Sequence, residues 1–466
     1  IVRQDGDGNG NGIELTSSHG TSHRIWKDSS GKLNIGPSSL PSSFVQDTSG
    51  NCGIGTAAPS QKLEVVGGSI HVPGGGAVST NEAFGTDALL NNTTGARNTA
   101  TGSLALLSNT EGYDNTATGS YALRYNTTGY RNTATGYLAL YQNTTGTYNV
   151  ATGQQALQQN TTGTQNTGHG YLTLYTNTTG SANTATGNHA LRHNTTGDNN
   201  VANGYEALYS NTTASNNVAH GRGAMRFNTT GGSNTASGYI SLYTNTTGSN
   251  NAATGYESLL YNTTGGANTA TGRTALRNNT TANHNTAHGY SALYNNTTGA
   301  YNVASGSQAI YKNTTGDYHT ASGYQVLYNN STGVRNTASG YQALYYNTTG
   351  GYHTASGYQA LFNNTTGGRN TASGYLAMHG NTTGSYNVGI GHQALYNNTT
   401  GSGNTLINPK NSSGFNAPVF NPTTENNRFS MGSTAVTNAY IQVAWTVVSD
   451  ARDKTDFAPV PHGLDF

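Results

Sequence analysis

The fold of this chain is decided by a repeated unit, of which one copy reads Asn370-Thr371-Ala372-Ser373-Gly374-Tyr375-Leu376-Ala377-Met378-His379-Gly380-Asn381-Thr382-Thr383-Gly384. The glycine equivalent to Gly374, called the core glycine below, recurs every 17 residues from Gly85 to Gly391, nineteen times without an insertion or deletion. A strict period held over about 300 residues is typical of one small structural unit stacked many times. The chain is therefore a repeat protein over most of its length.

The length and composition of the unit predict a coil of β-structure. Seventeen residues are too few for a helical hairpin and suit one turn of a β-coil. Threonine, valine and tyrosine favour strands, while glycine and asparagine suit corners. We predict one strand at Asn-Thr-Ala-Thr before the core glycine, a second at Ala-Leu-Tyr after it, and a turn at Asn-Thr-Thr-Gly. The predicted fold is all-β: a parallel β-solenoid or β-roll of about 19–20 turns with a 17-residue repeat.

Stacking places equivalent residues above one another and so predicts columns of side chains. The fourth position after the core glycine is leucine from Leu89 to Leu395, with three aliphatic replacements. We expect this column to point inward. The fourth position before the core glycine is asparagine in 17 turns and His319 or His353 in the other two. We expect it to form a hydrogen-bonded side-chain ladder.

The apolar content of a single turn favours association of several chains. A buried leucine contributes roughly 1.5–3 kcal/mol, while ordering the backbone of one residue costs roughly 1–2 kcal/mol. One leucine per turn is a thin core on that comparison. A homotrimer around a common axis is the preferred prediction, and a single-chain solenoid is the alternative.

Changes in composition divide the chain into four segments. Residues 1–80 lack the period and form an irregular β-rich segment, and residues 81–408 form the repeat array. The copy at Asn404-Thr405-Leu406-Ile407-Asn408 is degenerate, as expected of a terminal cap. Residues 409–448 form a β-rich stem, and residues 449–466 form a separate C-terminal segment.

Bulk composition argues against several classes of protein. Charged residues make up 8% of the chain and the formal net charge is +1, so no basic surface indicates a nucleic-acid partner. The single cysteine, Cys52, allows no intrachain disulfide framework. No apolar run approaches the length of a membrane span, and no signal peptide is visible. The chain begins at Ile1 and not at methionine, which indicates a processed or incomplete product.

One copy of the repeat resembles a known adhesin family. The stretch Asn387-Val388-Gly389-Ile390-Gly391-His392-Gln393-Ala394-Leu395 is similar to the head repeat of trimeric autotransporter adhesins. Those repeats are somewhat shorter, and most copies here have threonine where those have valine or isoleucine. The resemblance implies a left-handed parallel β-roll in a homotrimer.

A second resemblance lies near the C-terminus. The stretch Ser449-Asp450-Ala451-Arg452-Asp453-Lys454-Thr455-Asp456 resembles the opening of the intramolecular chaperone auto-processing domain of phage endosialidases and tail fibres. The strand-like run 440–448 and the residues 461–466 fit the same pattern, and the stretch 51–65 resembles a segment common in such fibres. The resemblance implies a domain that trimerises a β-helical fibre and then cuts itself off between Ser449 and Asp450. The chain stops at Phe466, before nearly all of such a domain.

The candidate catalytic residues of this sequence all lie in that C-terminal motif. Ser449 is the candidate nucleophile, Lys454 the candidate base, and Asp450 the residue after the scissile bond. We expect no other enzymatic activity, no cofactor and no metal, because no phosphate loop, zinc spacing or convincing carboxylate pair occurs. Single histidines just before a core glycine, at His169, His220 and His288, lie several turns apart and cannot converge on one metal. We expect them to face outward or to substitute in a ladder.

The Asn-Thr-Thr triplet of the turn is an N-glycosylation sequon. The sequon is complete in 18 of 19 copies, one of which reads Asn330-Ser331-Thr332, and Asn109-Thr110-Glu111 breaks it. Duplication of one accidental sequon would produce the same pattern. The candidate acceptors on these predicted turns are Asn92, Asn126, Asn143, Asn160, Asn177, Asn194, Asn211, Asn228, Asn245, Asn262, Asn279, Asn296, Asn313, Asn330, Asn347, Asn364, Asn381 and Asn398.

Repeat, composition and motif together predict a structural role. We expect a fibre protein of a phage or large virus, a trimeric rod used in host attachment at the virion surface or in the extracellular space. Its expected partners are itself and a host-surface glycan or receptor, with no nucleic acid and no membrane insertion. Two alternatives are a cellular extracellular filament or adhesin coated with glycan, and the stalk of a glycan-degrading tailspike.

Overall fold

The computed structural model describes residues 80–411, 413–414 and 417–436, together with the backbone of seven short strands in the preceding segment. It divides into two compact units, Ile1–His169 and Gly170–Phe466. Each unit is described by itself below. The described elements are all strands and turns.

The first unit begins with a small sheet in the segment that precedes the repeats. Its strands are β1 (Val2–Gln4), β2 (Gly12–Thr16), β3 (Ser22–Lys27), β4 (Leu33–Pro37), β5 (Phe44–Gln46), β6 (Cys52–Ile54) and β7 (Leu63–Val65). Neighbouring strands from β1 to β6 pair antiparallel, and β7 pairs parallel to β6.

The first unit then enters the repeat array, where each turn carries one three-residue strand. These strands are β8 (Glu82–Phe84), β9 (Thr99–Thr101), β10 (Thr116–Thr118), β11 (Thr133–Thr135), β12 (Val150–Thr152) and β13 (Thr167–His169). They pair parallel and in register, so that Ala100 lies opposite Ala117. The shift between partners is one repeat, which is the defining property of a solenoid.

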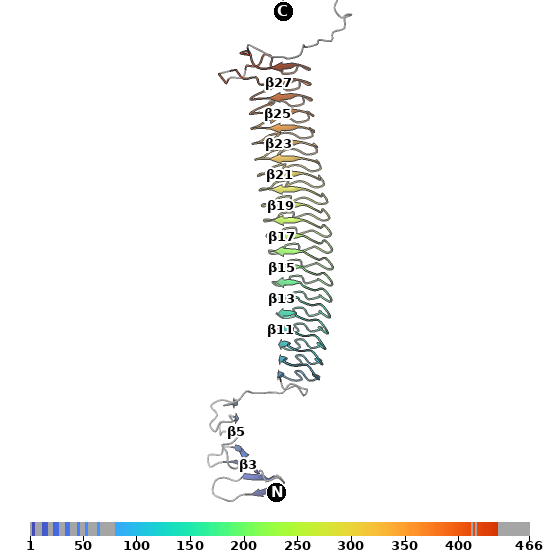
Figure 1. The fold of residues 1–466 in the computed structure, drawn as a ribbon, viewed down its shortest axis with the longest axis vertical. Coiled ribbons are helices and arrows are strands. Elements are labelled where there is room, and N and C mark those ends of the chain that lie inside the picture. Colours follow the sequence, from blue (N-terminus) through green and yellow to red (C-terminus); the bar gives the residue numbers. More distant parts are fainter. Residues whose placement is uncertain are drawn as a thin grey trace, which may run out of the picture. The chain divides into compact units, whose positions relative to one another are not determined.

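The second unit has the same pattern of one three-residue strand per turn (Figure 1). Its strands are β14 (Thr184–Thr186), β15 (Val201–Asn203), β16 (Val218–His220), β17 (Thr235–Ser237), β18 (Ala252–Thr254), β19 (Thr269–Thr271), β20 (Thr286–His288), β21 (Val303–Ser305), β22 (Thr320–Ser322), β23 (Thr337–Ser339), β24 (Thr354–Ser356), β25 (Thr371–Ser373), β26 (Val388–Ile390), β27 (Thr405–Ile407) and β28 (Phe429–Met431). The prediction of an all-β parallel β-solenoid of about 19 turns with a 17-residue repeat is confirmed.

The prediction of a second strand in each turn is wrong. After the core glycine the backbone alternates into the left-handed region, as at Gln342 (φ 52°) and Leu344 (φ 54°). A strand needs negative φ at every residue, so Ala-Leu-Tyr instead forms a tightly curved segment. This segment still hydrogen-bonds to the next turn, since the Leu344 amide donates to the Ala360 carbonyl at 2.9 Å.

The interior of the coil contains more apolar residues than the leucine column alone. Leu344 is fully buried, and so are the alanine that precedes it, Ala343, and Ala338 of the strand. The same holds in most turns of the array, although Thr173, Ser241, Ser258 or Val326 replaces the alanine before the leucine in four of them. The prediction that the column from Leu89 to Leu395 points inward is confirmed. Two alanine columns therefore close the core around each leucine within a single chain.

Close contact between turns explains why the core glycine never varies. Gly289 has φ +132°, and a Cβ added to it would lie 2.5 Å from the carbonyl oxygen of Gly306 in the next turn. Side-chain-bearing residues rarely adopt that φ, and no space exists for the extra atom. The gapless spacing of glycine in the sequence thus reflects backbone packed on backbone.

The stack continues beyond the end expected from the sequence. The strand β28 pairs parallel with β27, and Thr405 lies opposite Phe429. That shift is 24 residues, seven more than the repeat, so this turn carries an insertion after Asn408. The degenerate copy at Asn404-Thr405-Leu406-Ile407-Asn408 is therefore followed by one further, longer turn.

Candidate functional site

The asparagines before the strands form the ladder that their spacing predicts. The backbone amide of Asn302 donates to Oδ1 of Asn285, and Nδ2 of Asn302 donates to the carbonyl of Gly316. These side chains are buried throughout the array. Each asparagine therefore links its own turn to the turns on either side of it.

A second buried ladder runs through the asparagines of the Asn-Thr-Thr triplets. Nδ2 of Asn313 donates to Oδ1 of Asn296 at 2.8 Å and to the carbonyl of Gly316 at 2.9 Å. The Gly316 carbonyl thus accepts hydrogen bonds from both ladders, because Asn302 donates to it at 2.9 Å. Buried amides are stable only when their hydrogen bonds are made, and this arrangement makes them.

In the folded coil the side chains of the candidate acceptor asparagines are buried. Their backbone lies on a turn, but their side chains point inward and Nδ2 is the hydrogen-bonding atom. A sugar on that atom would displace both hydrogen bonds and would have no space. The side chains are at most 4% exposed at Asn92 and fully buried at Asn126, Asn143, Asn160, Asn177, Asn194, Asn211, Asn228, Asn245, Asn262, Asn279, Asn296, Asn313, Asn330, Asn347, Asn364, Asn381 and Asn398.

The sequence contains a signal for this ladder that the sequon obscures. Asparagine is present in all nineteen turns, including Asn109, where Glu111 replaces the second threonine. Glycosylation needs both the asparagine and the threonine two positions after it, whereas a structural amide needs only the asparagine. The invariance therefore belongs to the asparagine and not to the triplet.

Two histidines replace asparagine in the first ladder and remain buried there. Nδ1 of His319 accepts from the backbone amide of Asn336 at 3.2 Å, which places the proton of the neutral ring on Nε2. Burial lowers the pKa of His319 to about 4. Burial also lowers the pKa of His353 to about 4. Both rings are therefore neutral at physiological pH and act as amide substitutes.

The remaining candidate residues from the sequence lie either on the surface of the coil or outside the residues that the structure describes. His169, His220 and His288 are exposed on separate strands, as predicted. Within the described residues no group of three histidine, cysteine or acidic side chains is arranged to hold a metal ion. Across the same part of the chain, no helix could span a membrane. The self-cleavage candidates Ser449, Asp450 and Lys454 lie outside the described residues.

The outer surface of the second unit carries stacked aromatic columns. One runs through Tyr294, Tyr311, Tyr328, Tyr345, Phe362, His379 and Tyr396, with ring centroids 5.0–5.4 Å apart. Such offset stacks follow directly from equivalent side chains repeating at the spacing of the turns. They give this unit an amphipathic outer surface.

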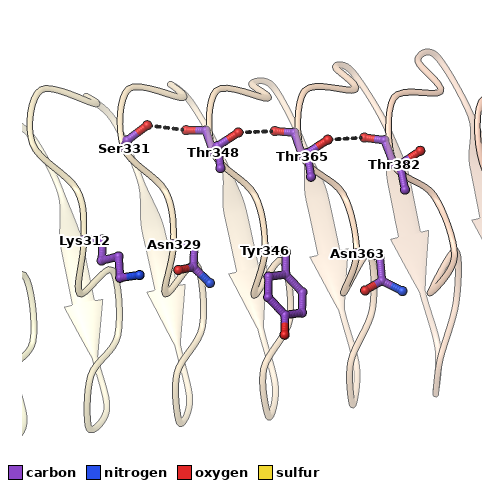
Figure 2. Close-up of a pocket in the computed structure, with 8 residues that line it drawn as sticks. All are labelled: Lys312, Asn329, Ser331, Tyr346, Thr348, Asn363, Thr365 and Thr382. Carbon is purple, nitrogen blue, oxygen red and sulfur yellow. Dashed lines mark hydrogen bonds between the residues drawn. The ribbon is translucent and has the colours of Figure 1, made fainter.

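A groove of about 670 Å³, lined by residues with polar side chains, crosses several turns (Figure 2). One wall is a chain of hydroxyls, in which Ser331 donates to the Thr348 carbonyl and Thr348 to the Thr365 carbonyl, both at 3.0–3.1 Å. The other wall presents Lys312, Asn329, Tyr346 and Asn363. The ordered hydroxyls and the side chains facing them suit hydrogen bonding to a hydroxylated ligand.

A smaller hollow of about 280 Å³ has a charged lining. Arg277 Nε lies 2.7 Å from a carboxylate oxygen of Glu257, which forms an ion pair. Arg273 lies in the same lining with tyrosines on both sides. Sequence reasoning missed this cluster, because its residues occupy columns where most turns have tyrosine, leucine or glutamine.

Comparison with known proteins assigns no function to these surface sites. Comparison with protein-family models, with curated proteins and with solved structures gave no significant match.

Proposed function

We propose that this protein is a structural fibre protein of a phage or large virus, used to attach the virion to its host. The observation that supports this best is the uninterrupted, in-register interior of each stack. Every turn hydrogen-bonds to its neighbours through backbone, side-chain amides and hydroxyls. An interior of this kind suits a stiff shaft that presents a surface along its length.

In this proposal three copies assemble side by side, each a left-handed coil. The hand comes from the resemblance to adhesin head repeats. The face formed by β22 to β25 supports the assembly, because its outward side chains are only threonine and serine, such as Thr337 and Ser339. A flat, uncharged face with short side chains allows a second copy to approach closely. The buried alanine columns mean that the thin-core argument for a trimer no longer carries weight by itself.

The partner in this proposal is a glycan or receptor on the host surface. The groove of Figure 2 supports a glycan, since hydroxyl, amide and aromatic groups line it. The alternative of a filament coated with N-linked glycan is less well supported, because the acceptor asparagines lie inside the coil.

Sedimentation equilibrium of the purified chain tests the assembly. We expect a species of three times 48.4 kDa, and a stable folded monomer would contradict the trimer. Immunogold electron microscopy with an antibody against the second unit tests the location. We expect label along fibres of virions, and label on cell filaments alone would contradict the viral assignment.

A further inference from the structure

One surface cluster occurs twice in the second unit, at a separation of 51 residues or three turns. Each copy contains a Tyr-Glu pair, an arginine at the next turn's corresponding tyrosine position, a second arginine four residues later, and a tyrosine one turn further on. The first copy is Tyr205, Glu206, Arg222, Arg226 and Tyr239, and the second copy is Tyr256, Glu257, Arg273, Arg277 and Tyr290.

In both copies the second arginine neutralises the glutamate. Arg226 Nε lies 2.7 Å from Glu206 Oε2, and Arg277 Nε lies 2.7 Å from Glu257 Oε2. These side chains are largely buried against the coil. The ion pair therefore fixes the floor of each cluster and leaves it without net charge.

The first arginine of each copy is exposed and has no acidic partner in the described part of the chain. The Arg273 guanidinium lies 5.5 Å from the ring centroid of Tyr256 and 5.9 Å from that of Tyr290. The Arg222 guanidinium lies 5.6 and 5.9 Å from the equivalent rings. Flanking rings hold a guanidinium in place without using its hydrogen-bond donors.

Around Arg273 the cluster opens into the 280 Å³ hollow, which hydroxyls also line. The hydroxyls of Thr274 and Ser291 lie 2.8 Å apart at its edge. With two arginines and one glutamate, the lining has one positive charge in excess. The unmatched charge, the hydroxyls and the tyrosine rings together favour a ligand that is anionic at one point and hydroxylated elsewhere.

We propose that Arg222 and Arg273 are the anion-binding residues of two related sites for a carboxylate-bearing polysaccharide, which differ in that Gly223 and Ile240 stand in the first where Thr274 and Ser291 line the second. The guanidinium binds the sugar carboxylate through paired hydrogen bonds, and the flanking tyrosines contact the sugar ring. The two arginines lie roughly 14 Å apart along the stack, as three turns at the strand spacing require. One polymer chain therefore reaches both sites, and the second contact is made at high effective concentration.

This inference rests on the proposed attachment role, since it names the chemistry of the host-surface partner. It can be tested separately from the attachment role. Soluble polysaccharide must bind the purified chain through these two arginines, whatever the oligomeric state or the virion location.

The test uses the full chain and oligogalacturonate of long and short chain length, with binding measured by titration calorimetry. The variant carries Arg222→Gln and Arg273→Gln. The matched control carries Arg335→Gln and Arg369→Gln, because those arginines also lie over tyrosine rings but already donate to Tyr352 and Tyr386 hydroxyls. Circular dichroism verifies that each variant keeps its β-structure.

We expect the double variant to bind long oligogalacturonate at least about tenfold more weakly, while the control binds as the unaltered chain does. Each single variant is expected to lose the advantage of the long oligomer over the short one. Absence of binding to the unaltered chain, or an equal loss in the control, would overturn the proposal. Equal or tighter binding of dextran or of dextran sulfate would overturn it too, since dextran has no anionic group and dextran sulfate carries sulfate but no carboxylate. A trimeric fibre that passes the sedimentation test but binds no oligogalacturonate refutes this inference alone.

Discussion

The interior and the outer surface of the coil are built from the same 17-residue turn, but they vary very differently. Inside, leucine, two alanines and two asparagines recur with few replacements, and the replacements are themselves buried, such as Met225 for leucine and His319 for asparagine. Outside, the equivalent of Tyr256 changes from turn to turn among tyrosine, arginine, histidine, serine, threonine, glutamine and asparagine. The interior carries one constraint repeated many times, and the surface is where individual turns differ in chemistry.

The largest expected effect comes from a single methyl group inside the stack. Gly289→Ala places a Cβ 2.5 Å from the Gly306 carbonyl oxygen at a φ that alanine avoids. We expect the free energy of unfolding, measured by urea titration, to fall by about 3–5 kcal/mol. Gly368→Ala is the control, because the nearest atom to its added Cβ is 3.5 Å away. Equal stability of the two variants would show that the turns are not packed backbone on backbone.

The next test distinguishes the structural role of the Asn-Thr-Thr asparagine from the triplet's role as a glycosylation sequon. Asn262→Ala removes hydrogen bonds to Asn245 and Gly265 and leaves Nδ2 of Asn279 without one acceptor. We expect a loss of about 2–4 kcal/mol in the free energy of unfolding. Thr264→Ala also destroys the sequon, but it changes an exposed side chain, so we expect less than about 0.5 kcal/mol.

Expression in a eukaryotic secretory pathway extends that comparison to glycosylation. Peptide mapping of the folded protein is expected to find Asn262 unmodified, because a sugar on its Nδ2 and the ladder exclude each other. Folded protein with a sugar on Asn262 would show that the ladder is not required.

The last expected effect is a pH dependence carried by the two buried histidines, which is absent at neutral pH. Burial lowers the pKa of His319 and His353 to about 4, whereas the unfolded chain titrates near 6.5. Between these values the unfolded chain binds more protons, so stability falls as pH falls from about 6.5 towards 4. At pH 4.5 we expect each histidine to cost about 2–3 kcal/mol relative to pH 7.

The paired substitutions His319→Asn and His353→Asn restore the ladder residue and serve as the comparison. We expect urea titrations of this variant to show a smaller loss between pH 7 and pH 4.5, since the other titrating groups are shared. An identical pH profile for both proteins would mean that the two rings are solvated and not part of the ladder.

The sequence alone determined the solenoid, the length of its turn, the inward leucine column and the first asparagine ladder. It did so because stacking converts a period into columns, and a column of one residue type has to share one environment. Residues such as Leu344 could therefore be placed without coordinates.

The tertiary structure decided the backbone conformation within each turn and which side chains contact one another between turns. The positive φ at Leu344 abolishes the second strand, and the inward direction of Asn313 turns a sequon into a ladder. The arginine clusters follow the same logic, because Glu257 and Arg277 are twenty residues apart in sequence but adjacent on the coil. The period fixes which residues align, whereas curvature of the backbone fixes whether an aligned residue points to the core or to solvent.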